Sequence, residues 1–473
     1  MTQLLPSGSS RQTRSGRRKS AESRSADKLR SADKSRSAAD ALLRQGIIRS
    51  VAVASAYKPR RNSLLLTVPT FFSSWLVSEA APELLAIWGF RTVRGVKRAR
   101  RDEEGLGVKG WMGLGLTAAA SVGAVGLIKE ARRSKEELDA SLSSLIPAKE
   151  LAEAPSSVRL GALLPLLNGN RRRKRSRNVV FNTPLPGQAP GPKLKLDIYT
   201  PLEKPSAGEK RPAVLQIHGG AWILGSKDEQ GIPLLNHLAS CGWVGFNANY
   251  RLSPKVHYPD HLVDCKTALA WIREHADEYN VDPDFIVVTG GSAGGHLCAL
   301  VALTQNDPAF QPGFEDADTS VQAAVPFYGV YDLTDRERLN GREFRQLMAK
   351  VVMGFGQNDR LEDWAAYSPL DRITDEAPPM MILHGDRDVL VPVEGARRFA
   401  ADLREASKNH VVYSELHGAQ HAFEVFPSIR TVNTVEAVER FLHHVHSEYL
   451  ATRDSSPEAV EPTPDDDVVA EIN

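Results

Sequence analysis

Cysteine is scarce in this chain of 473 residues. Only Cys241, Cys265 and Cys298 are present, and none of them belongs to a Cys-x-x-Cys pair. This scarcity argues against a disulfide framework and against a structural zinc site. We therefore expect each cysteine to be a small buried hydrophobic residue. The hydrophobic content of 42% is enough for the core of one large domain or two ordinary ones.

An apolar secretion signal near Met1 is also lacking, because the first 40 residues are mainly Ser, Ala, Arg and Lys. Residues 1–61 carry fifteen Lys or Arg against four acids, whereas residues 451–473 carry seven acids against Arg453 alone. Segments of this composition bury too little apolar surface to repay their ordering entropy. We expect a basic disordered tail over 1–61 and an acidic disordered tail over 451–473.

Charge is absent from two further stretches, 62–78 and 110–128. The second is nineteen residues long, which nearly spans a hydrocarbon core of about 30 Å, and its small residues suit close helix packing in lipid. We expect a membrane-associated region over 62–128. The alternatives are a basic hairpin in the membrane interface and a buried helix of a cytoplasmic protein. Positive charge on every flank leaves the side of the membrane open.

Residues 129–178 are expected to be a basic linker that ends in the run RRRKRSR at 171–177. Nucleic-acid binding by such a run would need exposure together with stacking aromatics or a binding fold nearby. Neither is evident in the sequence. We predict a solvated or membrane-facing charge run and no nucleic-acid partner.

From residue 179 onward, short apolar runs alternate with helix-length segments. The expected strands are LKLDIY (194–199), AVLQI (213–217), VGFNANY (244–250), FIVVT (285–289), AAVPFY (323–328), MMILH (380–384) and VVYSEL (411–416). The clearest helices are expected at 260–279, 292–304, 394–406 and 432–448. This alternation predicts an α/β fold with a mostly parallel sheet covered on both faces. The ligand site of such a sheet lies beyond the carboxyl ends of its strands.

One serine stands among four glycines in TGGSAGGHLCAL, residues 289–300, between an expected strand and an expected helix. Ser292 fits the pattern Gly-x-Ser-x-Gly, in which small neighbours let a tight turn lift the hydroxyl clear of the backbone. A phosphate-binding loop would need Lys and Ser or Thr after its last glycine. His296 and Leu297 follow Gly295 instead, so Ser292 is a candidate nucleophile.

A nucleophilic serine needs a base that a third group orients. The loop after MMIL offers Asp386 and Asp388, and the loop after VVYSEL offers His417 and His421. Both loops follow strands later in the chain than the serine, which is the order Ser, Asp, His. The glycines of the earlier HGG at 218–220 permit a turn whose amides could hold an oxyanion.

Residues 179–450 resemble the α/β-hydrolase superfamily, and within it the esterases of the hormone-sensitive-lipase and acetyl-esterase (carboxylesterase) type. The resemblance rests on LDIYTP, HGGAWILGS, NYRLSP, YPDHLVDCKTALAWI, GGSAGGHL and APPMMILHGDRDVLVPV. It implies that Ser292 is the nucleophile, Asp388 the acid and His421 the base. It also implies an oxyanion hole formed by the amides of Gly219, Gly220 and Ala293. HGGA and GGSAGG stand where that type usually has HGGG and GDSAGG, and these variants are more similar to the branch that includes bacterial carboxylesterases, acetyl esterases and arylformamidases.

The resemblance implies a serine hydrolase that cleaves carboxylic esters through an acyl-enzyme, with a small lid insert and no metal or cofactor. Its substrate would be a small-molecule or lipid ester. An arylformamidase-like amide hydrolase would use the same residues, and a membrane-tethered, non-catalytic hydrolase-fold scaffold is the alternative from another class. The oligomeric state is left open.

Other residues are expected to be structural. The forty or so residues at 334–376 lack an obvious strand and are a candidate lid or acyl-pocket wall. We expect His218 and His384 to orient loops and His296 to pack. We expect the histidines at 443, 444 and 446 to face solvent on the last helix.

Overall fold

The computed structural model describes residues 38–60, 64–101, 105–153, 173–182, 192–206 and 208–455. The chain divides into two compact units. The smaller unit comprises residues 1–59 and 72–129, and the larger unit comprises residues 60–71 and 130–473.

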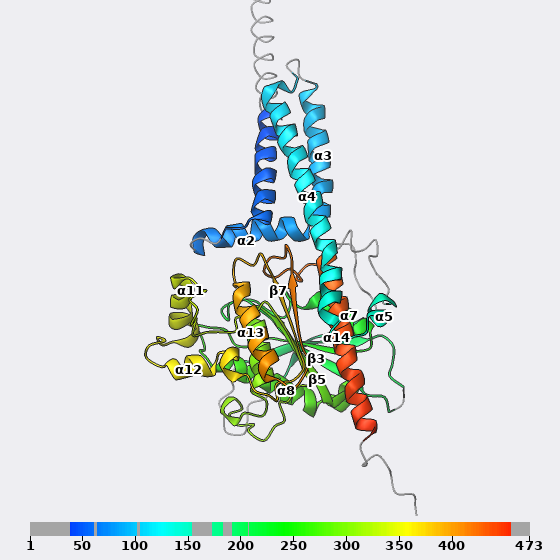
Figure 1. The fold of residues 1–473 in the computed structure, drawn as a ribbon, viewed down its shortest axis with the longest axis vertical. Coiled ribbons are helices and arrows are strands. Elements are labelled where there is room, and N and C mark those ends of the chain that lie inside the picture. The colour runs from blue at the N-terminus through cyan, green and yellow to red at the C-terminus, as the bar shows by residue number, and fades with distance from the viewer. Residues whose placement is uncertain are drawn as a thin grey trace, which may run out of the picture. The chain divides into compact units, whose positions relative to one another are not determined.

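The described part of the smaller unit consists of helices joined by short turns (Figure 1). Residues 38–57 form one helix, and α2 (Leu64–Glu79), α3 (Ala81–Ala99) and α4 (Gly107–Leu142) follow it. Helices α2 and α4 each continue into the larger unit. A Cβ atom at Gly113 would lie 2.5 Å from the backbone carbon of Leu42. The glycines of α4 thus allow close contact with the helix at 38–57.

This unit differs from the expected disordered tail over 1–61. Residues 38–57 are helical because Leu42, Val53 and Ala56 recur at helical spacing and are buried within the unit. The rest of the expected tail up to residue 37 lies outside the described residues. Among the described helices, α4 alone is long and apolar enough to cross a membrane, by length and composition. The described part of the 62–78 stretch lies in the shorter helix α2, which contains Pro69.

The larger unit contains an eight-stranded sheet in the order β1-β2-β4-β3-β5-β6-β7-β8. The strands are β1 (Arg173–Val180), β2 (Lys195–Pro201), β3 (Arg211–Ile217), β4 (Val244–Ala248), β5 (Val281–Gly291), β6 (Ala323–Phe327), β7 (Met380–Gly385) and β8 (Val411–Leu416). The pairings from β4 through β3 to β8 are parallel, whereas β1 and β2 join antiparallel. The predicted mostly parallel α/β sheet and its seven expected strands are confirmed.

Helices cover both faces of this sheet (Figure 1). On one face lie α8 (Asp260–Glu274), α10 (Ala293–Leu303) and α13 (Val393–Ala406), which pack with alternate strand residues such as Leu215. On the other face lie α7 (Ile232–Ser240), α14 (Ile429–Asp454) and the end of α4, which pack with Val214 and its equivalents. Such alternation of buried side chains is what a sheet with two covered faces requires. The expected helix at 260–279 is split into α8 and the short α9 (Ala276–Tyr279).

The segment 334–376 contains no strand, as expected. It forms α11 (Arg342–Leu347), a π-helical turn η3 (Met348–Met353), α12 (Leu361–Ala366) and a 3₁₀ turn η4 (Pro369–Arg372). Trp364 and Tyr367 are buried against the core. The roles of this segment as a lid and as the wall of an acyl pocket stay predictions.

The expected linker at 129–178 is largely part of the larger unit. It contains the end of α4, α5 (Ala148–Glu153) and most of β1, while residues 154–172 lie outside the described residues. The basic run becomes a strand because acids from distant segments neutralise it. Arg175 Nη2 lies 2.6 Å from Asp197 Oδ2, and Arg177 Nη2 lies 2.6 Å from Asp228 Oδ1. The prediction of a solvated run is wrong for Arg175, whose side chain is 19% exposed, whereas Arg177 is 56% exposed and remains solvated.

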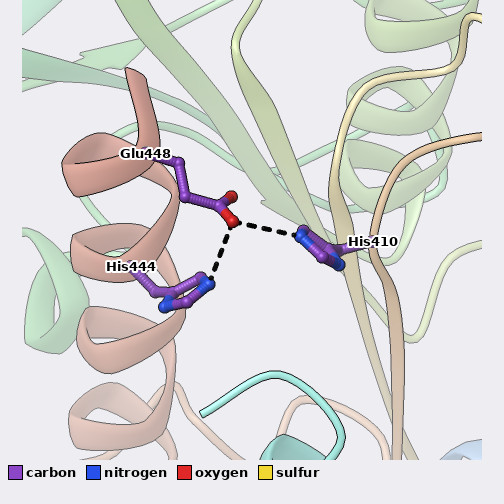
Figure 2. A group of neighbouring side chains, drawn as sticks. All are labelled: His410, His444 and Glu448. Atoms are coloured by element: carbon purple, nitrogen blue, oxygen red, sulfur yellow. Dashed lines mark hydrogen bonds and ion pairs between the residues drawn. The ribbon is translucent and has the colours of Figure 1, made fainter. Parts of the chain in front are cut away.

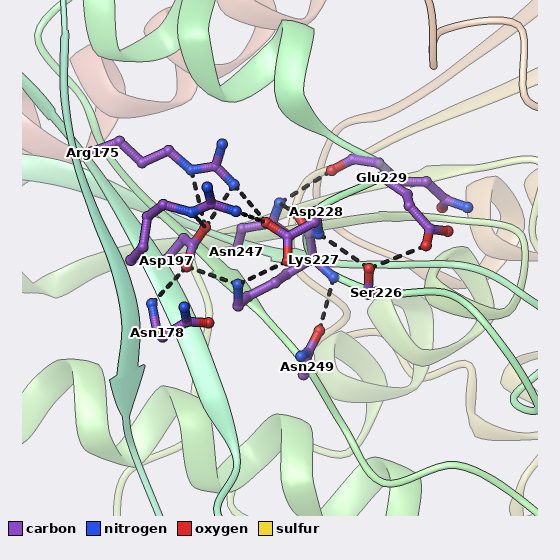
Figure 3. A network of polar contacts seen from close by, with 11 residues as sticks. Arg175, Asn178, Asp197, Ser226, Lys227, Asp228, Glu229, Asn247 and Asn249 are labelled. Carbon is purple, nitrogen blue, oxygen red and sulfur yellow. Dashed lines mark hydrogen bonds and ion pairs between the residues drawn. The ribbon is translucent and has the colours of Figure 1, made fainter.

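A buried ion pair stands at the centre of this polar network (Figure 3). Lys227 Nζ lies 2.9 Å from Asp197 Oδ1, and the two side chains are 1% and 0% exposed. The backbone N–H of Lys227 donates to Asn249 Oδ1 at 2.8 Å, and the amide of Asn247 donates to the carbonyl of Lys227 at 2.6 Å. The network fixes the loop that follows β3. Burial alone would raise the pKa of Asp197, but its bonds to Lys227, Asn178 and Arg175 lower it.

We expect Asp197→Asn to destabilise the protein by about 3 kcal/mol, because it leaves the Lys227 ammonium buried without its counter-charge. Asp228→Asn is the matched control, since the Asp228 side chain is 43% exposed and its loss should cost less than about 1 kcal/mol. Urea unfolding followed by tryptophan fluorescence measures both. Equal losses for the two variants would contradict a buried pair.

Candidate active site

Ser292 lies at the turn between β5 and α10 in a strained conformation. Its φ is 59° and its ψ is −120°, a region that residues with a side chain seldom occupy. Its backbone N–H donates to the carbonyl of Phe327 at 3.0 Å, which ties the turn to the end of β6. This is the geometry that presents a serine hydroxyl at the top of a sheet.

Two glycines make room for this turn. A Cβ atom at Gly290 would lie 2.4 Å from the carbonyl oxygen of Gly294, and one at Gly294 would lie 2.1 Å from that of Ile217. No real Cβ approaches a backbone oxygen so closely. The glycines on either side of Ser292 are therefore required by the contact between the turn and the end of β3.

The loop after β3 runs beside Ser292, as the sequence predicts. A Cβ atom at Gly219 would lie 3.0 Å from Cβ of Ser292. The next residues turn sharply, with φ of 120° at Gly220 and 52° at Ala221. Trp222 then places its ring in the core, 5.0 Å from the ring of His296. The loop thus brings several backbone amides to the vicinity of the serine.

The structure does not leave all of these amides available. The N–H of Gly219, an expected oxyanion donor, donates to Gln230 Oε1 at 2.6 Å. In the part of the chain that the structure describes, the N–H groups of Gly220 and Ala221 have no such acceptor. Gly219 is therefore not retained as a donor. The sequence alone could not reveal this, because Gln230 is eleven residues away.

Asp388 and His421 form a buried pair on the loops after β7 and β8. The Nδ1–H of His421 donates to Asp388 Oδ2 over 2.6 Å, and the side chains are 6% and 0% exposed. The second oxygen of Asp388 accepts the backbone N–H groups of Leu390 and Val391, each at 2.8 Å. Because Nδ1 is the donor, Nε2 of His421 carries a lone pair that can accept a proton.

Electrostatics keep Asp388 ionised in spite of its burial. Burial alone would raise the pKa of this carboxyl, but the charge of His421 and hydrogen bonds from His384 and His421 hold it well below its usual range. His384 Nε2 lies 3.3 Å from Asp388 Oδ2 and 3.1 Å from the carbonyl of Val391. The expectation that His384 orients a loop is met by these contacts.

The rival residues Asp386 and His417 form a pair of their own. His417 Nδ1 lies 2.7 Å from Asp386 Oδ2, and the side chain of His417 is 52% exposed. The helix α4 lies on this side, because Glu137 Oε2 accepts the N–H of His417 at 3.1 Å and Glu130 pairs with Arg387 at 2.9 Å. These contacts fix the loops that carry both pairs but do not reach Ser292.

Two aromatic rings lie beside His421, and no sequence motif indicated either of them. The ring of Tyr328, after β6, lies 4.5 Å from the ring of His421, and its hydroxyl donates to the buried Glu424. A Cβ atom at Gly291 would lie 2.6 Å from the Tyr328 hydroxyl, so this tyrosine connects the serine turn to the histidine loop. Phe71, in the part of α2 that belongs to the larger unit, lies edge-on to His421 at 6.2 Å. Within the described residues, no hydrogen bond joins Ser292 Oγ to His421.

The other histidines and the cysteines follow most of the expectations. Burial lowers the pKa of His218 to about 4 and that of His296 to about 3, so both are neutral at pH 7, as structural residues would be. Cys265 and Cys298 are buried as expected, but Cys241 is exposed at the end of α7. At the end of the chain, His443 faces solvent, whereas His446 is half-buried and its ring lies 4.5 Å from that of Phe285.

The chain is similar to several proteins that are named as esterases. The BD-FAE family matches residues 196–403. The chain is 38% identical to the "Probable carboxylic ester hydrolase LipM" of Mycobacterium tuberculosis over 413 residues, which are 87% of this chain and 94% of that protein. It is also 38% identical to the esterase LipQ of the same organism, over 71% of this chain and 80% of that protein. The apo structure of Thermogutta terrifontis esterase 2 is 28% identical, with a TM-score of 0.46 over 60% of this chain and 96% of that one.

The two Asp–His pairs can be separated by mutation. We expect His421→Gln to lower kcat/KM on p-nitrophenyl esters by about 10³-fold or more, because glutamine cannot accept the proton that the imidazole held by Asp388 would take. His417→Gln removes an exposed pair and should change kcat/KM by less than about tenfold. A larger loss in the His417 variant than in the His421 variant would reverse the assignment.

Proposed function

This chain belongs to the carboxylic ester hydrolases of the α/β-hydrolase superfamily, and on that premise we propose that Ser292, Asp388 and His421 are its catalytic triad. The observation that carries the proposal is the buried 2.6 Å contact between His421 and Asp388. The two loops involved follow β7 and β8, and Ser292 follows β5 in the same parallel part of the sheet. All three side chains therefore belong to the same edge of the sheet.

In the proposed reaction, His421 Nε2 takes the proton of Ser292 as Oγ attacks the ester carbonyl. Asp388 stabilises the imidazolium that forms. The oxyanion is held by the amides of Gly220, Ala221 and Ala293, the last at the start of α10, where helix amides are unpaired. The tetrahedral intermediate expels the alcohol, which takes its proton from His421. Water, activated by the same histidine, then attacks the acyl-enzyme and releases the carboxylic acid.

We propose a small-molecule or lipid ester as the substrate. The names of LipM, LipQ and LipC favour esters over amides, although the same triad would act on either. Phe71, whose ring lies edge-on to that of His421 at 6.2 Å, is an apolar neighbour of the proposed base, as an ester substrate with an apolar acyl group would suit.

Ser292→Ala should lower kcat/KM on p-nitrophenyl esters by about 10⁴-fold or more, because no nucleophile remains. A fluorophosphonate probe should label the unmodified chain and not the variant. Circular dichroism and thermal unfolding of the variant should match those of the unmodified chain. Activity retained by a folded Ser292→Ala variant would refute the triad, and absence of labelling in the unmodified chain would favour a non-catalytic scaffold.

We also propose that the smaller unit attaches the enzyme to a membrane. Besides the length of α4, large apolar side chains of this unit are exposed, among them Trp111 at 65%, Val122 at 74% and Phe90 at 63%. A soluble protein rarely displays so many in one small unit. Lipid would cover them, and the nearby basic residues of α3 would suit anionic headgroups.

Carbonate extraction of membranes tests this attachment. The full chain should stay in the pellet, and the double substitution Val122→Lys and Val125→Lys should release it, because each charge opposes burial in lipid. The control Leu202→Lys and Leu361→Lys alters exposed apolar residues of the larger unit and should stay in the pellet. Complete release of the unmodified chain would argue against a membrane-spanning helix.

A further inference from the structure

A group of metal-binding side chains lies apart from the proposed triad. His444 and Glu448 are one helical turn apart on α14, and His410 immediately precedes β8. Figure 2 shows the two imidazoles and the carboxylate directed toward one another. Residues from two separate elements thus converge on one point of the surface.

The spacing of the donor atoms fits a bound zinc ion. Nε2 of His410 and Nε2 of His444 each lie 3.4 Å from the same oxygen of Glu448, and all three ligand atoms lie within 4.8 Å of one another. Ligands about 2.0–2.1 Å from a tetrahedral zinc ion are about 3.4 Å apart. A direct hydrogen bond between nitrogen and oxygen is usually about 2.9 Å long. The observed distances match the edge of a tetrahedron better than a hydrogen bond.

The donor set also favours zinc over magnesium or calcium. Imidazole nitrogen suits zinc, whereas magnesium and calcium prefer oxygen ligands throughout. The side chains of His410, His444 and Glu448 are 47%, 26% and 49% exposed, so an ion can enter from solvent. Exposed side chains can also move, so the two imidazole nitrogens, which lie within 4.8 Å of each other, can approach to the distance that a shared ion requires. We propose that these three residues bind Zn²⁺, with water as the fourth ligand.

This site lies away from the proposed catalytic edge of the sheet. His410 precedes β8, whereas His421 follows it, so the site and the triad stand at opposite ends of that strand. The carbonyl of His410 accepts the N–H of Met380 at 2.9 Å, which fixes its backbone to the start of β7. A bound ion would therefore link the last helix to the edge of the sheet and stabilise the fold without entering the reaction.

The experiment is a titration of the purified full-length chain with zinc chloride by calorimetry, with thermal unfolding as a second measurement. We expect one zinc ion per chain and a zinc-dependent rise in Tm. His410→Ala, His444→Ala and Glu448→Gln should each weaken binding by about tenfold or more, since even loss of a residue that merely supports a ligand costs about 10- to 100-fold.

His443→Ala is the matched control, because His443 is exposed beside His444 on the same helix, and it should bind zinc normally. Cys241→Ser controls for the exposed thiol, whose sulfur lies 3.9 Å from Nε2 of His237. No zinc binding, or binding lost in the Cys241 or His443 variant and kept in the other three, would overturn the proposal. Binding unaffected by His410→Ala would overturn the three-ligand site.

Discussion

The structure of the larger unit around Ser292 depends on the close packing of the end of β3 against the turn between β5 and α10. Here the carbonyl of Ile217 would stand 2.1 Å from any Cβ at position 294, and the carbonyl of Gly291 would stand 2.5 Å from any Cβ at position 219. Because β3 and β5 are adjacent parallel strands, their ends must share this space. Glycine permits that approach, and the approach forces Ser292 into its left-handed conformation. The position of the serine and the path of the loop beside it are thus consequences of one steric constraint.

Buried charge is the second constraint, and the unit satisfies it by surrounding each carboxylate with donors. Asp388 receives two backbone N–H groups in addition to its two histidines, and Asp197 receives Lys227, Arg175 and the N–H of Asn178. In both cases these partners outweigh the burial that would raise the pKa. Asp386 and His417 show the contrast, because their side chains are 23% and 52% exposed and water screens part of their charge. Burial therefore distinguishes the pair of Asp388 and His421 from the pair of Asp386 and His417. In the sequence the two aspartates are only two residues apart and the two histidines only four.

The sequence predicted the features that depend on neighbouring residues in the chain. The seven apolar strands could be predicted because a strand covered on both faces is a continuous apolar run. The order of the motifs placed Ser292, Asp388 and His421 after the strands that became β5, β7 and β8. What the sequence could not predict depends on partners far away in the chain. In the sequence alone, β1 is a run of basic residues, because its ion pairs with Asp197 and Asp228 form only in the folded chain. Likewise, the sequence does not show that the N–H of Gly219 donates to the side chain of Gln230. Tyr328 and Glu424, ninety-six residues apart, belong to no motif at all.

Contacts between distant segments also show that the larger unit begins before residue 179. The end of α4 contributes Leu138 and Leu142 to the core on the α7 and α14 face. Its acids also reach both loops of the proposed triad, since Glu130 pairs with Arg387, next to Asp388, and Glu137 accepts the N–H of His417, four residues before His421. Burial of part of the Glu137 side chain raises its pKa, and its bond to the N–H of His417 acts in the opposite direction. A fragment beginning at 179 would therefore lack β1, part of the core and the partners of both loops, although it contains every residue of the motifs.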